Sequence, residues 1–286
     1  MKPRILLVSP LPPPASCGMA TYTLEILNSR LRDKYEFVVL NTAKPVYVGA
    51  MLPLNLLNSA KNFLKLVYLL SSRRFDVVLI ATSSYWGFYE KSLMLFLSRF
   101  LGKNVILSLR GGGFLDFYRN SGLKWWIKVA LDNASAIIVL SEYWEKELQE
   151  MTENKNVHVI GIHTYAAGDR TPRRVDGGKI RVIFVGRLEK NKGIYDLIEA
   201  IKILNESDGG KKLEFMIVGG DIDGVTRKYH ADNVSFLGEV NHGEVMKLYA
   251  SSHILVLPTY FEGCSYVIVE AMSFGLPVIS TNIPSI

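Results

Sequence analysis

The sequence predicts an α/β fold with two Rossmann-like, doubly wound domains, each built on a parallel sheet. Short runs of β-branched and aliphatic residues recur along the 286 residues, and segments with helical periodicity separate most of them. Such alternation is typical of parallel sheets covered by helices on both faces. It lapses once, between Gly161 and Lys179, where glycine, proline and charge replace the apolar pattern. We therefore expect domains over residues 1–164 and 180–286, joined by a linker over residues 165–179.

Each expected strand is a short apolar run, and the segments that separate the runs are expected to be mostly helical. In the first domain the runs are residues 5–9, 36–40, 76–81, 104–109, 136–141 and 157–161. In the second domain they are residues 180–186, 213–219, 234–238, 254–258 and 277–280. Ligands of doubly wound sheets bind at the carboxyl ends of the strands. The loops that follow these runs are therefore where a functional site is expected.

The composition is that of a soluble globular protein, with 49% hydrophobic and 21% charged residues. Cys17 and Cys264 lie far apart, so neither a disulfide framework nor a thiolate metal site is indicated, and a reducing cytosol fits. The first residues lack the apolar core of a signal peptide. No uninterrupted apolar run approaches the roughly 20 residues of a membrane span.

Positive charge is concentrated in the first part of the chain. Residues 1–175 carry a net charge of +9 and residues 176–286 one of −3. Two segments of the basic part, Met51–Arg74 and Gly122–Leu131, combine lysine with apolar bulk, and the second contains adjacent tryptophans. Tryptophan and lysine suit the surface of an anionic membrane. The alternative is a pair of helices packed on a sheet, whereas nucleic acid is disfavoured because no binding motif accompanies the charge.

Three loops that follow expected strands are rich in glycine. The first loop ends at Gly18, the second contains Arg110 and Gly111, and the third spans Gly186–Gly193. Glycine lets the backbone approach a ligand closely, and the start of a helix offers N–H groups to an anion. A tight turn explains any one of these loops equally well, but three together favour a phosphate ligand.

The loop Gly186–Gly193 also carries two cations, Arg187 and Lys192, at the expected start of a helix. Arginine can donate two hydrogen bonds to one phosphate and lysine acts as a point charge, so together they could hold a diphosphate. Solvated surface charge is the alternative. The GK[ST] order of a Walker A loop is absent, which disfavours a phosphate-transferring NTPase.

Glu270 lies in the middle of an apolar run that is expected to form a buried helix. A buried carboxylate costs several kcal/mol, roughly, unless a partner hydrogen-bonds to it. The partner could be a group of the protein, such as an arginine or a backbone amide, or it could be the hydroxyl groups of a ligand.

Other kinds of site have weaker support. Asp221 and Asp223 have a spacing that could hold a divalent cation, but aspartates in a glycine-rich turn are also common caps. The histidines have no metal-ligand spacing, the GxSxG motif of serine hydrolases is absent, and Gly111–Gly113 does not match the GxGxxG of nicotinamide dehydrogenases.

The segments Val185–Ile201 and Val234–Thr281, with Glu262 and Glu270 separated by seven residues, resemble the donor domain of a large enzyme family. The family is that of the retaining, nucleotide-sugar-dependent glycosyltransferases of the GT-B fold, the glycosyl transferases group 1 of family 4 type. The resemblance extends more loosely over nearly the whole chain. It implies two Rossmann-like domains that face each other across a cleft.

The resemblance also implies roles for single residues of the donor domain. Glu270 would take the ribose hydroxyls of the nucleotide, and Glu262 would lie in the loop that faces the donor sugar. Arg187 and Lys192 would hold the diphosphate and stabilise it as the leaving group. Backbone groups at the start of the following helix would meet the sugar and the phosphates; these belong to Cys264, Ser265, Tyr266 and Val267. No metal or other cofactor is then expected.

The amino-terminal domain departs from the family pattern. Gly18 matches the glycine of the first loop, which approaches the donor phosphates and the acceptor. Arg110 and Gly111 stand where many members have histidine and glycine. Arginine cannot act as a base at neutral pH, although it could hold phosphate or an anionic acceptor. Members usually continue well beyond Ile286, so we expect an incomplete donor domain whose activity is low or absent.

The resemblance thus implies transfer of a sugar from a nucleotide-diphosphate sugar to an acceptor hydroxyl, during the synthesis of a surface polysaccharide, lipopolysaccharide or other glycolipid. The acceptor would be a carbohydrate or a lipid-linked sugar. We expect a cytoplasmic protein, associated peripherally with the inner face of the plasma membrane. The alternatives are a non-catalytic relative that binds nucleotide and a sugar-nucleotide epimerase on the same fold.

Overall fold

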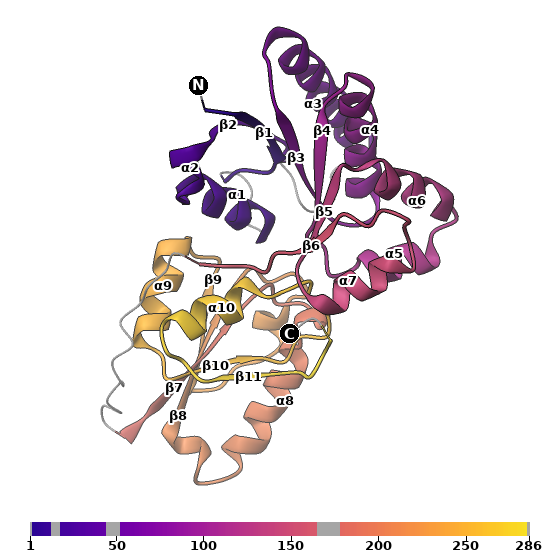
Figure 1. Ribbon diagram of the computed structural model, residues 1–286. Helices are drawn as coiled ribbons and strands as arrows, with labels where there is room; N and C mark the ends of the chain where they lie inside the picture. The colour runs from indigo at the N-terminus through magenta and orange to yellow at the C-terminus, as the bar shows by residue number, and fades with distance from the viewer. Residues whose placement is uncertain (1, 13–17, 44–51, 165–177, 285–286) are drawn as a thin grey trace. The chain divides into compact units, whose positions relative to one another are not determined.

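The computed structural model describes residues 2–12, 18–43, 52–164 and 178–284 (Figure 1). The chain forms two compact units, Met1–Ile162 and His163–Pro284. Most of the predicted linker, residues 165–177, lies outside the described residues. The two units are described separately.

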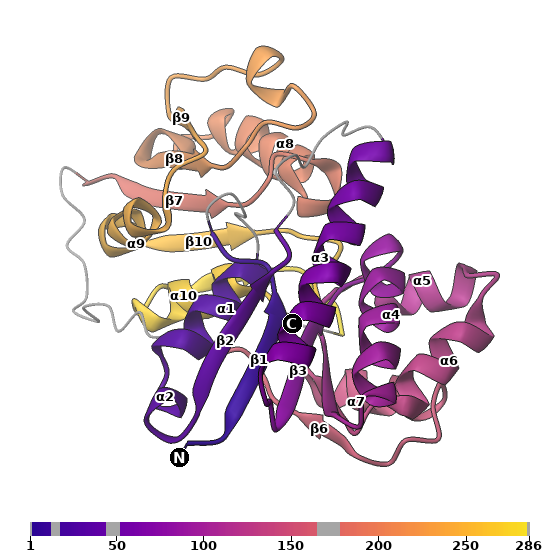
Figure 2. The same cartoon turned by 90° about the horizontal axis from the view of Figure 1, so that it is seen from above.

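The first unit is built on a six-stranded parallel sheet with the order β2-β1-β3-β4-β5-β6. Its strands are β1 (Arg4–Ser9), β2 (Glu36–Asn41), β3 (Val77–Thr82), β4 (Asn104–Leu109), β5 (Ala136–Val139) and β6 (Val157–Val159). Its helices are α1 (Gly18–Asn28), α2 (Leu31–Lys34), α3 (Leu52–Ser72), α4 (Trp86–Phe100), α5 (Phe114–Asn120), α6 (Lys124–Asn133) and α7 (Glu142–Gln149). The helices α3, α4 and α6 form a layer in which α3 contacts α4 and α4 contacts α6 (Figures 1 and 2).

The second unit is built on a five-stranded parallel sheet with the order β11-β10-β7-β8-β9. Its strands are β7 (Ile180–Val185), β8 (Leu213–Val218), β9 (Val234–Gly238), β10 (Ile254–Leu257) and β11 (Val278–Ser280). Its α-helices are α8 (Ile194–Asn205), α9 (His242–Ser251) and α10 (Tyr266–Ser273), and its short 3-10 turns are η2 (Lys190–Lys192), η3 (Gly210–Lys212) and η4 (Val225–Arg227). The α/β class with two parallel sheets, predicted from the sequence, is confirmed.

Central strands are buried along most of their length, as expected of parallel strands covered on both faces. In β1, Leu6, Leu7 and Val8 are completely buried although successive side chains point to opposite faces. The edge strands β2 and β9 are less buried, because a sheet edge has a neighbour on one side alone. Continuous apolar runs therefore marked the centres of the sheets, and their carboxyl ends position the loops discussed below.

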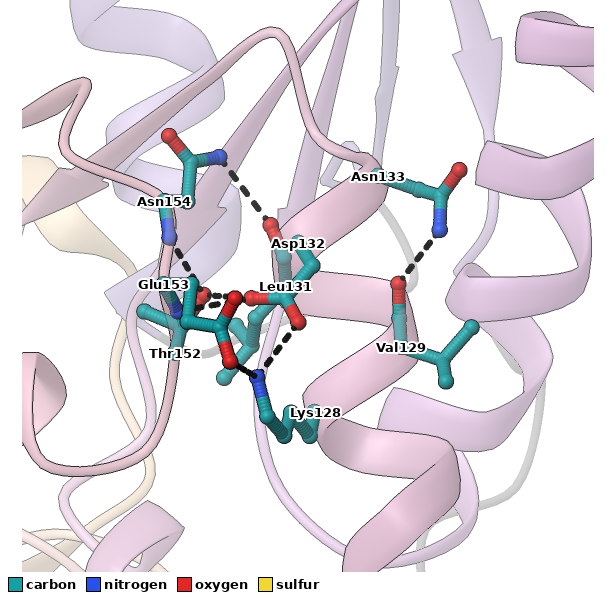
Figure 3. A network of polar contacts seen from close by, with 8 residues as sticks. All are labelled: Lys128, Val129, Leu131, Asp132, Asn133, Thr152, Glu153 and Asn154. Carbon is teal, nitrogen blue, oxygen red and sulfur yellow. Dashed lines mark hydrogen bonds and ion pairs between the residues drawn. The ribbon is translucent and has the colours of Figure 1, made fainter.

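Polar contacts at the end of α6 tie this helix to the segment that leads into β6 (Figure 3). Lys128 Nζ donates to Asp132 Oδ2 at 2.8 Å and to Glu153 Oε1 at 3.0 Å. Asp132 Oδ1 also accepts from the Thr152 hydroxyl and from the Glu153 amide. Partial burial opposes ionisation of Asp132, but these hydrogen bonds outweigh it and hold its pKa below the usual value. Lys128 is thus engaged by carboxylates of its own chain.

The two adjacent tryptophans of α6 have different surroundings. Trp126 packs edge-on against Phe96 of α4, with ring centroids 5.3 Å apart, and its Nε1 donates to Ser92 Oγ at 2.7 Å. Trp125, by contrast, is exposed. Helix packing, the alternative to a membrane contact at the sequence level, therefore accounts for Trp126 and Lys128 but leaves Trp125 unexplained.

Candidate functional site

The candidate site of the second unit lies where β7 and β10 end. The loop after β7 runs through Arg187 and η2 to Gly193, and the loop after β10 runs from Pro258 to the start of α10. The Asn191 carbonyl accepts hydrogen bonds from the Tyr260 amide at 3.0 Å and from the Thr259 hydroxyl at 3.1 Å. These contacts join two loops that are far apart in the sequence.

Gly193 is required where the two loops meet. Its φ of +71° lies in the left-handed region, and a Cβ at this position would lie 1.9 Å from the Pro258 carbonyl oxygen. Any side chain would push the loops apart, because such a contact is far inside the van der Waals limit. The glycine predicted to open the helix is therefore also what lets Lys192 approach the loop after β10.

Lys192 and Glu262 form an ion pair at this junction. Lys192 Nζ donates to Glu262 Oε1 at 2.5 Å, across 70 residues of sequence. The two side chains are 21% and 12% exposed, so water screens the pair only in part. The structure thus brings together two of the three residues predicted to be catalytic.

Arg187, the third of these residues, is exposed and lies on the loop after β7. Its Nη2 lies 2.7 Å from Glu189 Oε1. The Arg187 side chain is 65% exposed, so solvent reaches it. An anion bound near Lys192 could therefore use its remaining donors.

Glu270 is buried in α10, as predicted, and only 4% of its surface is exposed. Its Oε1 lies 2.9 Å from Nε2 of His242, the first residue of α9. The fully buried Tyr249 also interacts with Glu270. Burial raises the pKa of the Tyr249 hydroxyl well above its usual value, and the negative charge of Glu270 adds to this. Glu270 thus has a protein partner, one of the two possibilities that the sequence left open.

His242 was missed at the sequence level. It lies 28 residues before Glu270, and only the packing of α9 against the same sheet brings the two side chains together. Its side chain is about half exposed, so the Glu270 carboxylate lies directly beneath the surface. At the start of α9 the Asn241 side chain accepts from the Glu244 amide at 3.0 Å, a local contact that carries no information about the distant one.

The start of α10 lies between Glu262 and Glu270. Ser265 occupies the N-cap position and is buried, while Cys264, Tyr266 and Val267 are partly buried. The Ser265 side chain makes no capping hydrogen bond. The first N–H groups of a helix have no partner within the helix, and they attract anions. The four residues predicted to meet sugar and phosphate thus surround a helix start in the second unit.

Asp221 and Asp223 act as structural acceptors. Asp221 accepts from the Val225 amide at 2.7 Å and from the Thr226 amide at 3.0 Å. Partial burial works against ionisation, but these bonds hold the pKa of Asp221 below its usual value. Asp223 Oδ2 accepts from the Lys190 amide at 3.0 Å. In the described residues, no three His, Cys, Asp or Glu side chains are grouped so that they could hold a metal ion.

The candidate residues of the first unit lie at the carboxyl end of its sheet. Gly18 begins α1, and Arg110 and Gly111 follow β4. The Arg110 guanidinium carbon lies 3.5 Å from the centre of the Tyr22 ring, and its Nε donates to Ser108 Oγ at 3.1 Å. Its Nη1 is buried and has no hydrogen-bond partner among the described residues. Arg110 thus retains a donor for an anion.

Gly111 allows close contact between the loops after β3 and β4, because a Cβ there would lie 2.9 Å from Ser83 Cα. In the loop after β3, two residues beyond Ser83, Tyr85 has a φ of +55° and an exposed ring. A tyrosine in this region of backbone space is strained, and such strain often occurs at ligand sites. Sequence patterns gave no sign of this strain.

Comparison with known proteins supports the resemblance. Residues 179–286 match the family model described as glycosyl transferases group 1. A Klebsiella pneumoniae protein, described as an uncharacterized 41.2 kDa protein in the cps region, is 26% identical over 248 residues, which cover 81% of this chain and 67% of that protein. The putative teichuronic acid biosynthesis glycosyltransferase TuaC of Bacillus subtilis is 28% identical over 165 residues, which cover 54% of this chain and 41% of TuaC. The chain therefore spans only part of the length of these relatives.

The fold is also similar to that of HepE from Anabaena, which was solved in complex with UDP and glucose. The TM-score is 0.69 at 16% identity, and the alignment covers 99% of this chain and 81% of HepE. This similarity confirms that the chain has the two-sheet α/β fold of the GT-B glycosyltransferases. In the described residues, no helix is both long and apolar enough to cross a membrane.

Proposed function

Because residues 179–286 belong to the glycosyl transferases group 1 family, we propose that the chain transfers a sugar from a nucleotide-diphosphate sugar to an acceptor hydroxyl. The observation that carries this proposal is the convergence of Lys192 and Glu262 from two loops at one end of the second sheet. Arg187 lies on the loop after β7, and Glu270 lies in α10, the helix that follows the loop after β10. A donor that bears phosphates and hydroxyls needs cations and a carboxylate in this combination.

The nucleotide part of the donor is proposed to bind at Glu270. Its Oε1 contacts the half-exposed His242, so hydroxyl groups of a ribose could reach the carboxylate from the surface. Hydrogen bonds to an ionised carboxylate contribute about 1.5–3 kcal/mol each. His242 acts in this proposal as a positioning residue that keeps Glu270 oriented towards the ribose.

The diphosphate is proposed to bind between Arg187, Lys192 and the start of α10. As the bond between sugar and diphosphate breaks, negative charge grows on the phosphate oxygen. Cations already in place stabilise this charge more strongly in the transition state than in the ground state, and therefore increase the rate. Glu262 would face the positive charge that develops on the sugar. The donor site then needs neither a metal ion nor a covalent nucleophile, and we propose that the anomeric configuration is retained.

On the acceptor side, we propose roles for Gly18, Arg110 and Gly111. The buried Nη1 of Arg110 could donate to a phosphate or to an anionic group of the acceptor. A surface polysaccharide or glycolipid is the proposed product, which fits the naming of TuaC as a teichuronic acid biosynthesis glycosyltransferase. A lipid-linked acceptor would further require contact with a membrane, so we propose a peripheral location at the inner face of the plasma membrane.

Calorimetric titration with UDP, GDP and ADP tests the donor site. The wild type should bind one of the three, and Lys192→Ala and Glu270→Ala should each weaken this binding by at least ten-fold. The exposed pair Lys202 and Glu199 on α8 provides the control variants Lys202→Ala and Glu199→Ala. Unchanged affinity in both site variants would remove the proposed site.

A second assay supplies the matching nucleotide sugars with and without carbohydrate acceptors. Transfer of the sugar supports the proposal. Nucleotide binding without transfer or donor hydrolysis would identify a non-catalytic relative, and interconversion of the donor without an acceptor would identify an epimerase.

A further inference from the structure

The outer face of α3 carries large apolar side chains where a surface helix normally carries polar ones. Leu57, Leu64 and Tyr68 are 67%, 68% and 69% exposed. Lys61 and Lys65 are also exposed. These five residues are separated by three or four positions, or by one, so they lie along one side of the helix. We call them the α3 face.

The α3 face is not needed to hold the first unit together. The opposite side of the helix supplies the buried contacts, through Leu66 and Leu70. The five residues of the face instead line a shallow surface groove, together with Ala60. Single exposed leucines are common in soluble proteins, but a continuous stripe of them marks an interaction surface.

The charge of the α3 face has one sign. The 21 residues of α3 include two lysines and neither aspartate nor glutamate. In the described part of the chain, Lys61 and Lys65 take part in no ion pair, whereas Lys128 of α6 is held by Asp132 and Glu153. Lysines between leucines and a tyrosine match a surface that is anionic outside and apolar beneath.

The neighbouring helix α4 extends the same character. Leu93 and Phe100 are seven positions apart, which places them on one side of α4, and both are exposed. Phe100 is 88% exposed at the end of the helix. Since α3 contacts α4, two adjacent helices of one layer present apolar side chains to solvent.

We propose that the α3 face is the surface through which the chain docks on an anionic lipid bilayer. Leu57, Leu64 and Tyr68 enter the boundary between headgroups and acyl chains, while Lys61 and Lys65 contact lipid phosphates. This inference gives the proposed peripheral location a definite surface, but it does not depend on glycosyl transfer. Nucleic acid also carries phosphates for lysines, but it offers no apolar layer into which Leu57, Leu64 and Tyr68 could insert.

Flotation of the whole chain with lipid vesicles tests the proposal. The chain should float with vesicles of equal parts phosphatidylglycerol and phosphatidylcholine, and should not float with phosphatidylcholine alone. A lysine near an anionic surface is worth about 1 kcal/mol, which corresponds to about five-fold in affinity. The double variant Lys61→Gln/Lys65→Gln should therefore bind about 25-fold more weakly, and Leu57→Ser/Leu64→Ser/Tyr68→Ser should lose binding.

Matched controls use exposed residues outside the α3 face. Lys34→Gln/Lys155→Gln removes two exposed lysines of the same unit, and Ile203→Ser removes an exposed apolar side chain of the second unit. Both should float like the wild type. All the changed side chains are exposed, so every variant should fold, and circular dichroism checks that it does.

Three results would overturn the proposal: no flotation of the wild type, equal flotation of the lysine variant, or equal flotation of the apolar variant. Sedimentation velocity identifies a different occupant. If the wild type dimerises without binding vesicles and the apolar variant is monomeric, the α3 face joins two copies of the chain. Nucleotide titration of the same samples separates this outcome from the proposed function, because the donor residues lie in the other unit.

Discussion

Replacing Glu262 and replacing Lys192 should change nucleotide affinity in opposite directions. In the ligand-free protein, Lys192 Nζ lies 2.5 Å from Glu262 Oε1, so a diphosphate that binds to Lys192 arrives beside a negative charge. We predict that Glu262→Gln, which removes this charge and keeps the shape of the side chain, binds UDP more tightly than the wild type. Lys192→Gln should bind UDP more weakly.

The size of each effect follows from the geometry of the pair. A phosphate on the far side of the Lys192 ammonium would lie about 5–6 Å from the Glu262 carboxylate, and at an effective dielectric constant of about 20 the repulsion is about 3 kcal/mol. Because both side chains are partly exposed, screening should leave about half of it, which corresponds to roughly ten-fold tighter binding. Lys192→Gln loses a charged hydrogen bond worth about 1.5–3 kcal/mol, or roughly 10- to 150-fold in affinity.

Isothermal titration calorimetry with UDP measures both effects. UDP is used without a sugar, so that any contact between Glu262 and the donor sugar does not enter the result. Lys190→Gln, a change to a neighbouring lysine on the same turn, serves as the control and should shift the affinity less than three-fold. If Glu262→Gln weakened UDP binding ten-fold or more, the assumed repulsion would be wrong, and Glu262 would belong to the nucleotide site itself.

Three further predictions concern single contacts. His242→Ala should weaken UDP binding about five-fold in calorimetry, because a lost hydrogen bond of about 1 kcal/mol leaves Glu270 less well oriented, and an unchanged affinity would exclude this positioning role. In urea unfolding, Gly193→Ala should lower the free energy of unfolding by more than about 2 kcal/mol, since the new Cβ meets the Pro258 carbonyl and the backbone is strained as well. The control Gly224→Ala has a similar φ but open space around it, and should lower the free energy of unfolding by about 1 kcal/mol. Equal losses in the two variants would contradict the packing argument. Asp132 has a lowered pKa in the folded state, so it stabilises the protein above its unfolded pKa of about 3.9 and this contribution is lost as pH falls through the lower folded value. Asp132→Asn should therefore be less stable than the wild type at pH 7 in the same assay, and the difference should shrink in acid; a difference that is constant with pH would refute it.

The parallel sheets were predictable because strand formation leaves a local signal. The runs that contain β1 and β7 have consecutive apolar residues at 5–8 and 182–185, a short pattern rich in β-branched residues that is typical of a strand buried on both faces. Burial of Glu270 was predictable for a similar reason, because α10 has apolar residues on nearly every side. These properties depend on neighbours in the sequence, so the sequence alone reveals them.

Contacts between distant segments could not be predicted in the same way. The approach of His242 to Glu270 depends on how α9 and α10 pack on their sheet, and no local pattern records that packing. The two tryptophans of α6 show the same limit. Tryptophan is typical of membrane anchors, so the sequence treats both alike. In the structure Trp126 donates to Ser92 and packs against Phe96 of α4, whereas Trp125 is exposed.

Gly193 shows how a correct local prediction can have an additional cause. From the sequence, Gly193 was expected at the start of a helix, where a glycine lets the backbone approach an anion. The structure adds that the Pro258 carbonyl occupies the space of a side chain at this position. The loop after β10 was recognised from its glutamate, but its contact with the loop after β7 required the folded chain.

A crystal structure of the chain with UDP is the most direct test of the central claim, that Glu270 and the cations of the loop after β7 form one nucleotide-diphosphate site. Our account predicts that the ribose hydroxyls lie within hydrogen-bond distance of the Glu270 carboxylate and that the diphosphate contacts both Arg187 and Lys192. A bound UDP whose ribose lies elsewhere, with the Glu270 carboxylate held by groups of the protein alone, would contradict it.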